Sequence, residues 1–299
     1  MNTNILGRYK NGNYTVTILS DGTKIRRTED DIFLPAFAEN CDVKITDRCD
    51  GGCEMCYEGC TPTGKHADLL GTKFIDTLHP YTELALNGND MSHSDLIPFL
   101  EKLKVKKIIA NLTVNQVHFE RHFDYIKSLV DRELIYGLGI SLRKPTAEFI
   151  EKVKQFPNAV IHTINGILTP ADVEALMDKD LKILILGYKV RERGIDFFYN
   201  HQSEIEANQE WLNSNLTDLP SHFKCVSFDN LTIEQLNVRR LMTEDEWNEF
   251  YMGDDGGYTF YIDMVDKKFA RNSVSDKRYD MLDSIDEMFK MIQKESENQ

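Results

Sequence analysis

The chain has 299 residues, of which 41% are hydrophobic, enough for a sizeable core in one large domain or one domain with small additions. Asp and Glu total 49 against 35 for Lys and Arg, so the formal net charge is −14 and nucleic acid is not favoured as a partner. The opening residues lack the apolar run of a signal peptide, and no apolar run reaches the length of a membrane span, so we expect a cytoplasmic protein with no membrane partner.

Residues 1–38 are predicted to form a small N-terminal appendage. The segments YTVTIL and TKIRRT alternate between apolar and polar residues, and Asp21-Gly22 between them is a strong signal for a tight turn. The pattern therefore predicts a β-hairpin from about Tyr14 to Thr28.

Residues 39–195 are predicted to form the core of an α/β protein. Short apolar runs alternate with amphipathic stretches, which is typical of repeated strand–helix units and a parallel sheet. The strand candidates are CDVKIT, TELALNG, KIIANLTV, LIYGLGISL, NAVIHTING and LKILILGYK. The helix candidates run from Lys73 to His79, Ser94 to Leu103, Phe119 to Asp131, Thr146 to Phe156 and Pro170 to Asp178.

Six such units, joined by right-handed crossovers, fit either a doubly wound sheet or part of a barrel, and periodicity does not choose between the two. In both architectures the loops that leave the carboxyl ends of the strands gather on one face, where ligands bind. The loop after the first strand candidate is therefore expected on the ligand-binding face.

Residues 196–299 follow a less regular pattern. Strand candidates occur at KCVSFDN and YTFYIDMV, and helix candidates run from Thr232 to Met242 and from about Tyr279 to Ile292. We expect an irregular α+β extension that caps the core and shapes a substrate pocket.

Four of the six cysteines fall within twelve residues, directly after the first strand candidate. In a reducing compartment such crowding indicates a metal or a cluster rather than disulfides. Cys49, Cys53 and Cys56 have the spacing C-x3-C-x2-C in a glycine-containing loop. Three thiolates on one loop bind three corners of a 4Fe-4S cluster and leave the fourth iron open.

Two rival interpretations of this loop remain. A zinc-stabilised interaction module would need a fourth ligand, and structural zinc sites usually form from two separated pairs. A non-catalytic iron-sulfur electron carrier would close its cluster through Cys60. In the bacterial ferredoxin run, however, the fourth cysteine ligates a second cluster, and no second set of cysteines occurs here. We therefore interpret Cys60 as a neighbour rather than a ligand.

At these residues the sequence resembles the radical S-adenosylmethionine superfamily, whose motif C-x3-C-x-aromatic-C follows the first strand of a partial (β/α)6 barrel. Here Met55 precedes the third cysteine and the aromatic residue, Tyr57, follows it. The resemblance implies cofactor contacts at both positions. It also implies an oxygen-sensitive enzyme that cleaves S-adenosylmethionine reductively, so that a 5′-deoxyadenosyl radical abstracts hydrogen from an unknown substrate. The segments NGNYTVTILSDGTKIR and FYIDMVDKKFARNS are similar to a group of such proteins in phage and bacterial genomes.

The resemblance implies further cofactor contacts at the ends of later strands. The second strand ends Asn87-Gly88-Asn89-Asp90, where the family often carries Gly-Gly-Glu to accept hydrogen bonds from the methionine amine. An ordinary turn capped by Asn and Asp is the alternative reading of that segment. The other implied contacts are Ser141 and Arg143 after the fourth strand, Asn165 after the fifth and Gly187 after the sixth.

Cations follow the sixth strand on the same face. Lys189, Arg191 and Arg193 are candidates to dock a phosphate or carboxylate of the substrate, with a solvated charge run as the alternative. The resemblance does not identify the substrate, and two classes stay open: a peptide or protein side chain, and a small metabolite or nucleotide. The resemblance also implies a reducing partner such as flavodoxin or ferredoxin.

Overall fold

The computed structural model describes residues 4–296, and its main feature is a ten-stranded sheet. The strand order is β10-β9-β8-β7-β6-β5-β4-β11-β12-β13, and the eight strands from β10 to β11 in that order are mutually parallel. The protein therefore has an α/β fold built on a large, mostly parallel sheet. The strands are β4 (Asn40–Lys44), β5 (Glu83–Asn89), β6 (Ile109–Asn115), β7 (Gly137–Ser141), β8 (Ala159–Ile164), β9 (Lys182–Leu186), β10 (Cys225–Phe228), β11 (Thr259–Asp263), β12 (Lys268–Ala270) and β13 (Tyr279–Asp280).

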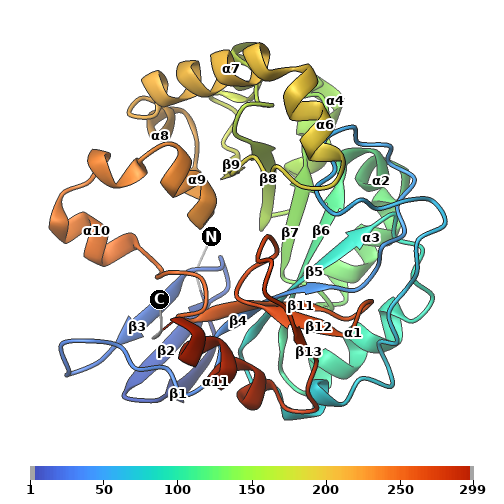
Figure 1. Ribbon diagram of the computed structural model, residues 1–299, viewed down its shortest axis with the longest axis vertical. Helices are drawn as coiled ribbons and strands as arrows, with labels where there is room; N and C mark the ends of the chain where they lie inside the picture. The colour runs from blue at the N-terminus through green and yellow to red at the C-terminus, as the bar shows by residue number, and fades with distance from the viewer. Residues whose placement is uncertain (1–3, 297–299) are drawn as a thin grey trace.

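The two faces of this sheet differ in polarity. Along β6, Leu112 and Val114 are buried in the main core, while Asn111 and Thr113, which alternate with them, point to the other face and are only partly buried. Figure 1 shows the strands from β9 round to β4 in an arc, with α1 to α4 and α7 outside it. The helices are η1 (Lys73–Thr77), α1 (Leu96–Val105), α2 (Gln116–Arg121), α3 (Phe123–Asp131), α4 (Ala147–Val153), α5 (Pro170–Leu176), α6 (Arg193–Asn200), α7 (Gln202–Asn215), α8 (Leu219–His222), α9 (Asn230–Gln235), η2 (Val238–Leu241), α10 (Glu244–Phe250) and α11 (Ile285–Ser296).

A separate three-stranded sheet is formed by β1 (Ile5–Asn11), β2 (Tyr14–Leu19) and β3 (Lys24–Arg27). The predicted hairpin corresponds to β2 and β3, whereas β1 was not predicted. The two-residue Gly12-Asn13 turn that joins β1 to β2 is itself a hairpin signal, so the sequence contains the information for this strand.

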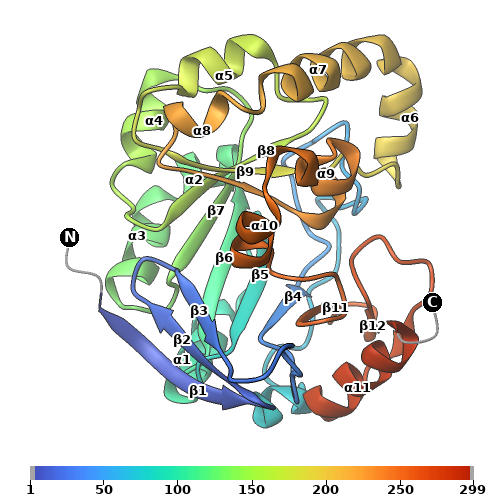
Figure 2. The same ribbon diagram turned by 90° about the vertical axis from the view of Figure 1, so that its left-hand side faces the viewer.

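The small sheet packs against the amino ends of the parallel strands. Its core contacts Ile109 at the start of β6, and the Asn158 amide, just before β8, donates to the Ser20 carbonyl. Figure 2 shows β1 to β3 across the lower end of the large sheet. This end of the sheet is therefore covered by the chain's own residues.

A buried carboxylate joins the two sheets. Glu39 is fully buried and accepts hydrogen bonds from the Tyr14 hydroxyl at 2.5 Å and the Arg26 Nε at 2.9 Å, with Lys24 Nζ at 3.2 Å. Burial alone would raise the pKa of Glu39, but the ion pairs with Lys24 and Arg26 hold it below its usual value. The negative charge is thus fully compensated.

Three predicted helices differ from the observed ones. The helix expected from Phe119 to Asp131 is interrupted at His122, which separates α2 from α3. The helix expected from Thr232 to Met242 ends early because Asn237 adopts a left-handed conformation with φ of 47°. The helix expected from Tyr279 begins only at Ile285, because Tyr279 and Asp280 pair with β12 instead.

The C-terminal third contributes directly to the large sheet through β10 at one side and β11 to β13 at the other. Helices α9 and α10 lie at the side of the arc between these strands in Figure 1. Helix α10 was not predicted, although its capping box between Thr243 and Glu246 is a recognisable start signal. Within residues 4–296 no helix is long and apolar enough to span a membrane.

Candidate active site

The cysteines lie in a long loop that leaves the carboxyl end of β4, defined here as the cysteine loop, residues 46–66. Isolated bridges pair Thr46 with His66 and Arg48 with Thr61, so both ends of the loop are fixed to each other. The backbone N–H of Cys49 also donates to the Thr61 carbonyl at 2.9 Å. The loop therefore presents its cysteines from a closed base at the ligand-binding face of the sheet.

The three thiols predicted to bind iron are half-buried and form no disulfide. Burial raises the pKa of Cys49, and the Gly51 N–H, 3.4 Å from its sulfur, opposes that shift. The sulfur of Cys53 accepts from the Asn115 amide at 3.4 Å and from the Arg143 guanidinium at 3.1 Å. Hydrogen-bond donors and one positive charge therefore lie beside these two sulfurs, whereas burial disfavours the thiolate of Cys49.

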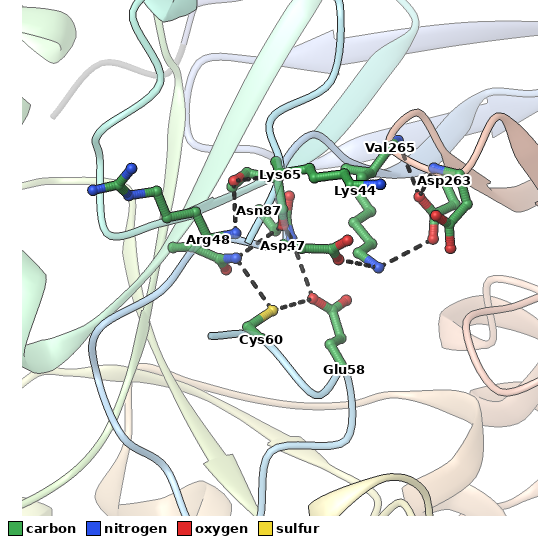
Figure 3. Close-up of polar contacts among 12 residues, drawn as sticks. Lys44, Asp47, Arg48, Glu58, Cys60, Lys65, Asn87, Asp263 and Val265 are labelled. Atoms are coloured by element: carbon green, nitrogen blue, oxygen red, sulfur yellow. Dashed lines mark hydrogen bonds and ion pairs between the residues drawn. The ribbon is translucent and has the colours of Figure 1, made fainter. Parts of the chain in front are cut away.

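The third thiol, Cys56, interacts with Cys60. A hydrogen bond from the Cys60 thiol lowers the pKa of Cys56 to about 5, with a further contribution from the nearby Arg193. The same hydrogen bond, together with burial, raises the pKa of Cys60. The buried Cys60 sulfur also lies 3.6 Å from a Glu58 oxygen and 3.4 Å from the Asn89 amide nitrogen, as Figure 3 shows for Glu58.

Arg193 holds the cysteine loop from the outside. Its Nε donates to the Cys53 carbonyl at 3.2 Å, and its two terminal nitrogens donate to the Cys60 carbonyl at 3.0 and 3.1 Å. The sequence suggested Arg193 as a substrate ligand, but its hydrogen bonds in the structure go to the loop backbone. Arg191 points elsewhere, toward the Ser275 carbonyl.

A second clamp acts on the other side of the loop. The carboxylate of Asp50 pairs with the fully buried His118 at 2.5 Å and with Arg121 at 2.8 Å. The hydrogen bond from His118, followed by that from Arg121, lowers the pKa of Asp50 to about 2. Both partners come from α2, so this helix and the loop are held together.

The predicted residues at the end of β5 support the cysteine loop. The Asn87 side chain accepts from the Ile45 N–H at 2.7 Å and donates to Glu58 at 3.2 Å, and both Asn87 and Asn89 donate to the Thr46 carbonyl. Figure 3 shows Asn87 between the start of the loop and Glu58. Their amide groups therefore fix the start of the loop.

Other predicted positions have structural partners as well. A Cβ on Gly88 would lie 3.0 Å from apolar side chains of β6, and one on Gly187 would lie 2.4 Å from Leu231. Both glycines therefore permit close packing between elements. Asp90 accepts from Ser92 and lies 3.5 Å from the Arg48 guanidinium.

Asn165 is the predicted residue with unused hydrogen-bonding capacity. It is 1% exposed, its amide nitrogen donates to the Gln235 oxygen at 3.0 Å, and its own oxygen has no partner. Gln235 is fixed in turn because it accepts from the N–H and donates to the carbonyl of Tyr188. The Asn165 oxygen is therefore a preoriented, buried acceptor. Ser141 ends β7 in register with Asn115 of β6.

The residues around the third cysteine lie between the loop and the C-terminal residues. The Met55 carbonyl is 3.5 Å from the position a Cβ would take on Gly194, so the loop backbone contacts the start of α6. The Lys189 ammonium lies 4.1 Å from the centre of the Tyr57 ring and donates to the Ser273 hydroxyl at 3.0 Å.

Sequence reasoning missed several residues that shape this site. Asn115 follows a predicted strand directly, so the rule that ligand-binding residues occupy strand ends was sufficient to find it. The roles of Glu58, His118 and Gln235 depend on contacts with distant segments, for which the sequence carries no local signal. Among residues 4–296, no three His, Cys, Asp or Glu side chains are grouped so that they hold a metal ion.

Comparisons with known proteins inform the fold. No family model and no curated protein sequence matches this chain. Among solved structures, SuiB of Streptococcus suis, crystallised with bound S-adenosylmethionine, is similar with a TM-score of 0.53 at 11% identity. The match covers 83% of this chain and 64% of SuiB, so the chain spans less than two thirds of that protein. At this identity the likeness concerns the fold.

Proposed function

We propose that the protein is a radical S-adenosylmethionine enzyme in which Cys49, Cys53 and Cys56 bind a 4Fe-4S cluster. The observation that carries this proposal is the C-x3-C-x2-C loop at the carboxyl end of the first parallel strand, with its thiols free and flanked by arginines. When bound, the cluster would supply the electron that cleaves S-adenosylmethionine and so generates a radical that abstracts hydrogen from substrate. The likeness of the fold to that of a protein that binds S-adenosylmethionine supports it.

The chemistry of the donor set fits a cluster. The thiols receive hydrogen bonds from Gly51, Asn115 and Arg143, which lower the cost of holding several thiolates together. A single zinc ion with Zn–S bonds of about 2.3 Å needs sulfurs about 4 Å apart, whereas a cubane holds its thiolates on separate irons.

The contacts of Cys60 favour a position beside the proposed cluster rather than a role as its ligand. Its thiol is buried and already hydrogen-bonded to Cys56, Glu58 and Asn89. In the proposed enzyme it shields the loop interior, and one iron stays open for the methionine group of the cofactor. The rival electron carrier would instead recruit Cys60 as the fourth ligand.

The cofactor would lie across the carboxyl ends of the strands, in a partial (β/α)6 barrel formed by β4 to β9. The side-chain oxygen of Asn165 accepts no hydrogen bond within residues 4–296, so it is suited to accept one from an N–H or O–H of the nucleoside. Arg143, exposed beside Cys53, is suited to the methionine carboxylate, and Ser141 lies on the same strand end. The shape of the proposed cofactor site also depends on the packing and loop contacts, described above, of Asn87, Gly88, Asn89 and Gly187.

The proposal also includes a compartment, a reducing partner and a role for the segments on either side of the core. The enzyme would work in the cytoplasm with a reducing partner such as flavodoxin or ferredoxin. Residues 1–38 and 196–299 would flank the core as a cover for the amino ends of the strands and a cap over the pocket.

The test is anaerobic reconstitution with iron and sulfide, followed by dithionite and S-adenosylmethionine. We expect a cluster with about four irons, identified by its electronic spectrum, and formation of 5′-deoxyadenosine. Cys53→Ala is expected to abolish both, whereas Cys60→Ala, the matched control on the same loop, retains both. Binding of one zinc, or a cluster that requires Cys60 and leaves the cofactor intact, would contradict the proposal.

A further inference from the structure

A cleft of about 490 Å³ lies between the cysteine loop and the C-terminal residues. From the loop it is lined by Tyr57 and Gly59, and from the C-terminal residues by Tyr261, Ser273 and Arg278. Because the loop forms part of its lining, a molecule in this cleft would lie next to the residues proposed to bind the cofactor.

Most carboxylates that line the cleft are already compensated. Lys44 lies 2.5 Å from Asp47 and 3.1 Å from Asp263, and Figure 3 shows the three side chains converging. Glu58 accepts hydrogen bonds from the Asn87 amide and from the Tyr57 hydroxyl, both at 3.2 Å. These acids are therefore held by other partners and form no ion pair with Arg191 or Arg278.

Three cations gather instead around the turn at Ser273 to Ser275. The Arg278 guanidinium donates to the Ser273 carbonyl at 2.8 Å, Lys189 donates to the Ser273 hydroxyl at 3.0 Å, and Arg191 approaches the Ser275 carbonyl at 3.5 Å. None of the three forms an ion pair with a carboxylate of residues 4–296. Lys189 is partly balanced by the electrostatic attraction of Asp42 and Glu58, whereas Arg191 and Arg278 contact only neutral groups.

Four further charged residues line the cleft, and two of them, Asp266 and Lys65, are of opposite sign and form no ion pair within residues 4–296. Glu192 lies over the backbone of Gly59, with its oxygen 3.1 Å from the position of a Cβ there, and thus belongs to the side of the cysteine loop. Lys268 pairs with Asp280 at 2.6 Å. Apart from Lys65, the cations of the cleft that form no ion pair therefore lie on the side formed by the 273–278 segment and Arg191.

This arrangement is unusual in a chain whose net charge is −14, since carboxylates outnumber cations and would be expected to neutralise them. A guanidinium has five N–H donors in a planar fork, and one carbonyl contact leaves most of them free. Two such forks beside an ammonium match an oxyanion, which they bind through charge-assisted, bidentate hydrogen bonds.

We propose that Arg191, Arg278 and Lys189 form a subsite that binds an oxyanion of the substrate, either a carboxylate or a phosphate. Arg193 is not part of it, because its guanidinium is occupied by carbonyls of the cysteine loop. The identification of the ligand as substrate rests on the proposed function; the binding of the oxyanion does not. The subsite would anchor one end of the substrate while its reacting carbon extends toward the cysteine loop.

Isothermal titration calorimetry on the full chain tests the subsite, with inorganic phosphate and succinate as separate probes at constant ionic strength. We expect saturable binding of at least one probe, and the preferred one identifies the oxyanion. Arg278→Gln and Arg191→Gln should each weaken it at least tenfold. Lys277→Gln, which removes an exposed charge next to Arg278 but outside the cleft, should change it less than twofold.

Circular dichroism of each variant verifies that it is folded, and the two arginine variants serve as independent tests. The inference is overturned when neither probe binds the wild-type chain saturably, or when both folded arginine variants retain wild-type affinity. The same preparations are assayed for 5′-deoxyadenosine. Probe binding without cofactor cleavage contradicts only the proposed function, and cleavage without probe binding contradicts only the subsite.

Discussion

At the amino ends of the parallel strands the charge of Glu39 is fully paired, whereas at the carboxyl ends thiols, Asn165 and two arginines retain unused hydrogen-bonding capacity. Both ends contain buried polar groups, and burial is costly without partners. The paired charge of Glu39 is therefore a sign of structural stabilisation, and the cations without an ion pair at the other end are a sign of a ligand. The contrast concerns charge, because the neutral Tyr9 hydroxyl and Asn40 oxygen near the amino ends lack partners within residues 4–296, as the Asn165 oxygen does.

The largest effect is expected from Glu39→Gln, which leaves Lys24 and Arg26 beside a neutral side chain in a buried position. Removal of one partner from a buried ion pair costs about 3 kcal/mol. We expect the free energy of unfolding to fall by about that amount in chemical denaturation, with cluster binding unchanged in the folded fraction. Glu29→Gln, an exposed change just beyond β3, is the control. Equal stability of the two variants would remove the contrast between the ends.

A smaller effect on the free energy of unfolding is expected when the pH is lowered and His162 takes up a proton. The imidazole of His162 lies over Gly139 of β7. Burial lowers the pKa of His162 to about 4, below its unfolded value of 6.5. The unfolded state therefore takes up the proton first, and stability is lost as pH falls from 6.5 toward 4. Between pH 7.5 and pH 5, wild type should lose about 2 kcal/mol more than His162→Gln.

Thermal or chemical unfolding at several pH values measures that difference. His222 provides a contrast of opposite sign, because its hydrogen bond with Asp178 raises the pKa of the imidazole. His222→Gln should therefore remove stability that is present at low pH and lost as pH rises. Parallel pH profiles for wild type and His162→Gln would show that the interior of the sheet is more solvated than its burial suggests.

The smallest effect on global stability is expected from Arg193→Gln, which loses partly exposed hydrogen bonds to the Cys53 and Cys60 carbonyls. We expect the free energy of unfolding to fall by about 1 kcal/mol. The loop itself should open more often, so that thiol alkylation in the metal-free protein becomes several times faster. Arg240→Gln, which loses a hydrogen bond to Asn213 on α7, should leave alkylation unchanged. Equal alkylation rates would show that Arg193 does not hold the loop.

Local patterns were sufficient for most of the large sheet. Strands such as β6 and β9 are short apolar runs between polar stretches, and periodicity identifies these without knowledge of their neighbours. The breaks at His122 and Asn237 were not predictable, because apolar spacing continues through them and the interruption depends on tertiary packing. Strand β13 was hidden for a similar reason, since only its pairing with β12 defines it.

In the candidate site too, some features follow from local sequence and others depend on tertiary contacts. The cysteine spacing marks the loop, and the structure brings Arg143, which the resemblance implied as a cofactor contact, to 3.1 Å from the Cys53 sulfur. Which arginine faces the loop and which faces the cleft could not be read from the sequence, because Arg191 and Arg193 alternate around a turn whose Glu192 has a φ of 46°. The free oxygen of Asn165 likewise depends on Gln235, 70 residues away.

The contacts of Arg193 also set an order of events during synthesis of the chain. The cysteines emerge early, yet the arginines that hold their loop follow 90 residues after Cys53 in one case and 140 in the other. Such distant contacts form late, after the intervening strands have paired. The thiols of the nascent loop therefore remain open to solvent, and to oxidation, until most of the parallel sheet has been made.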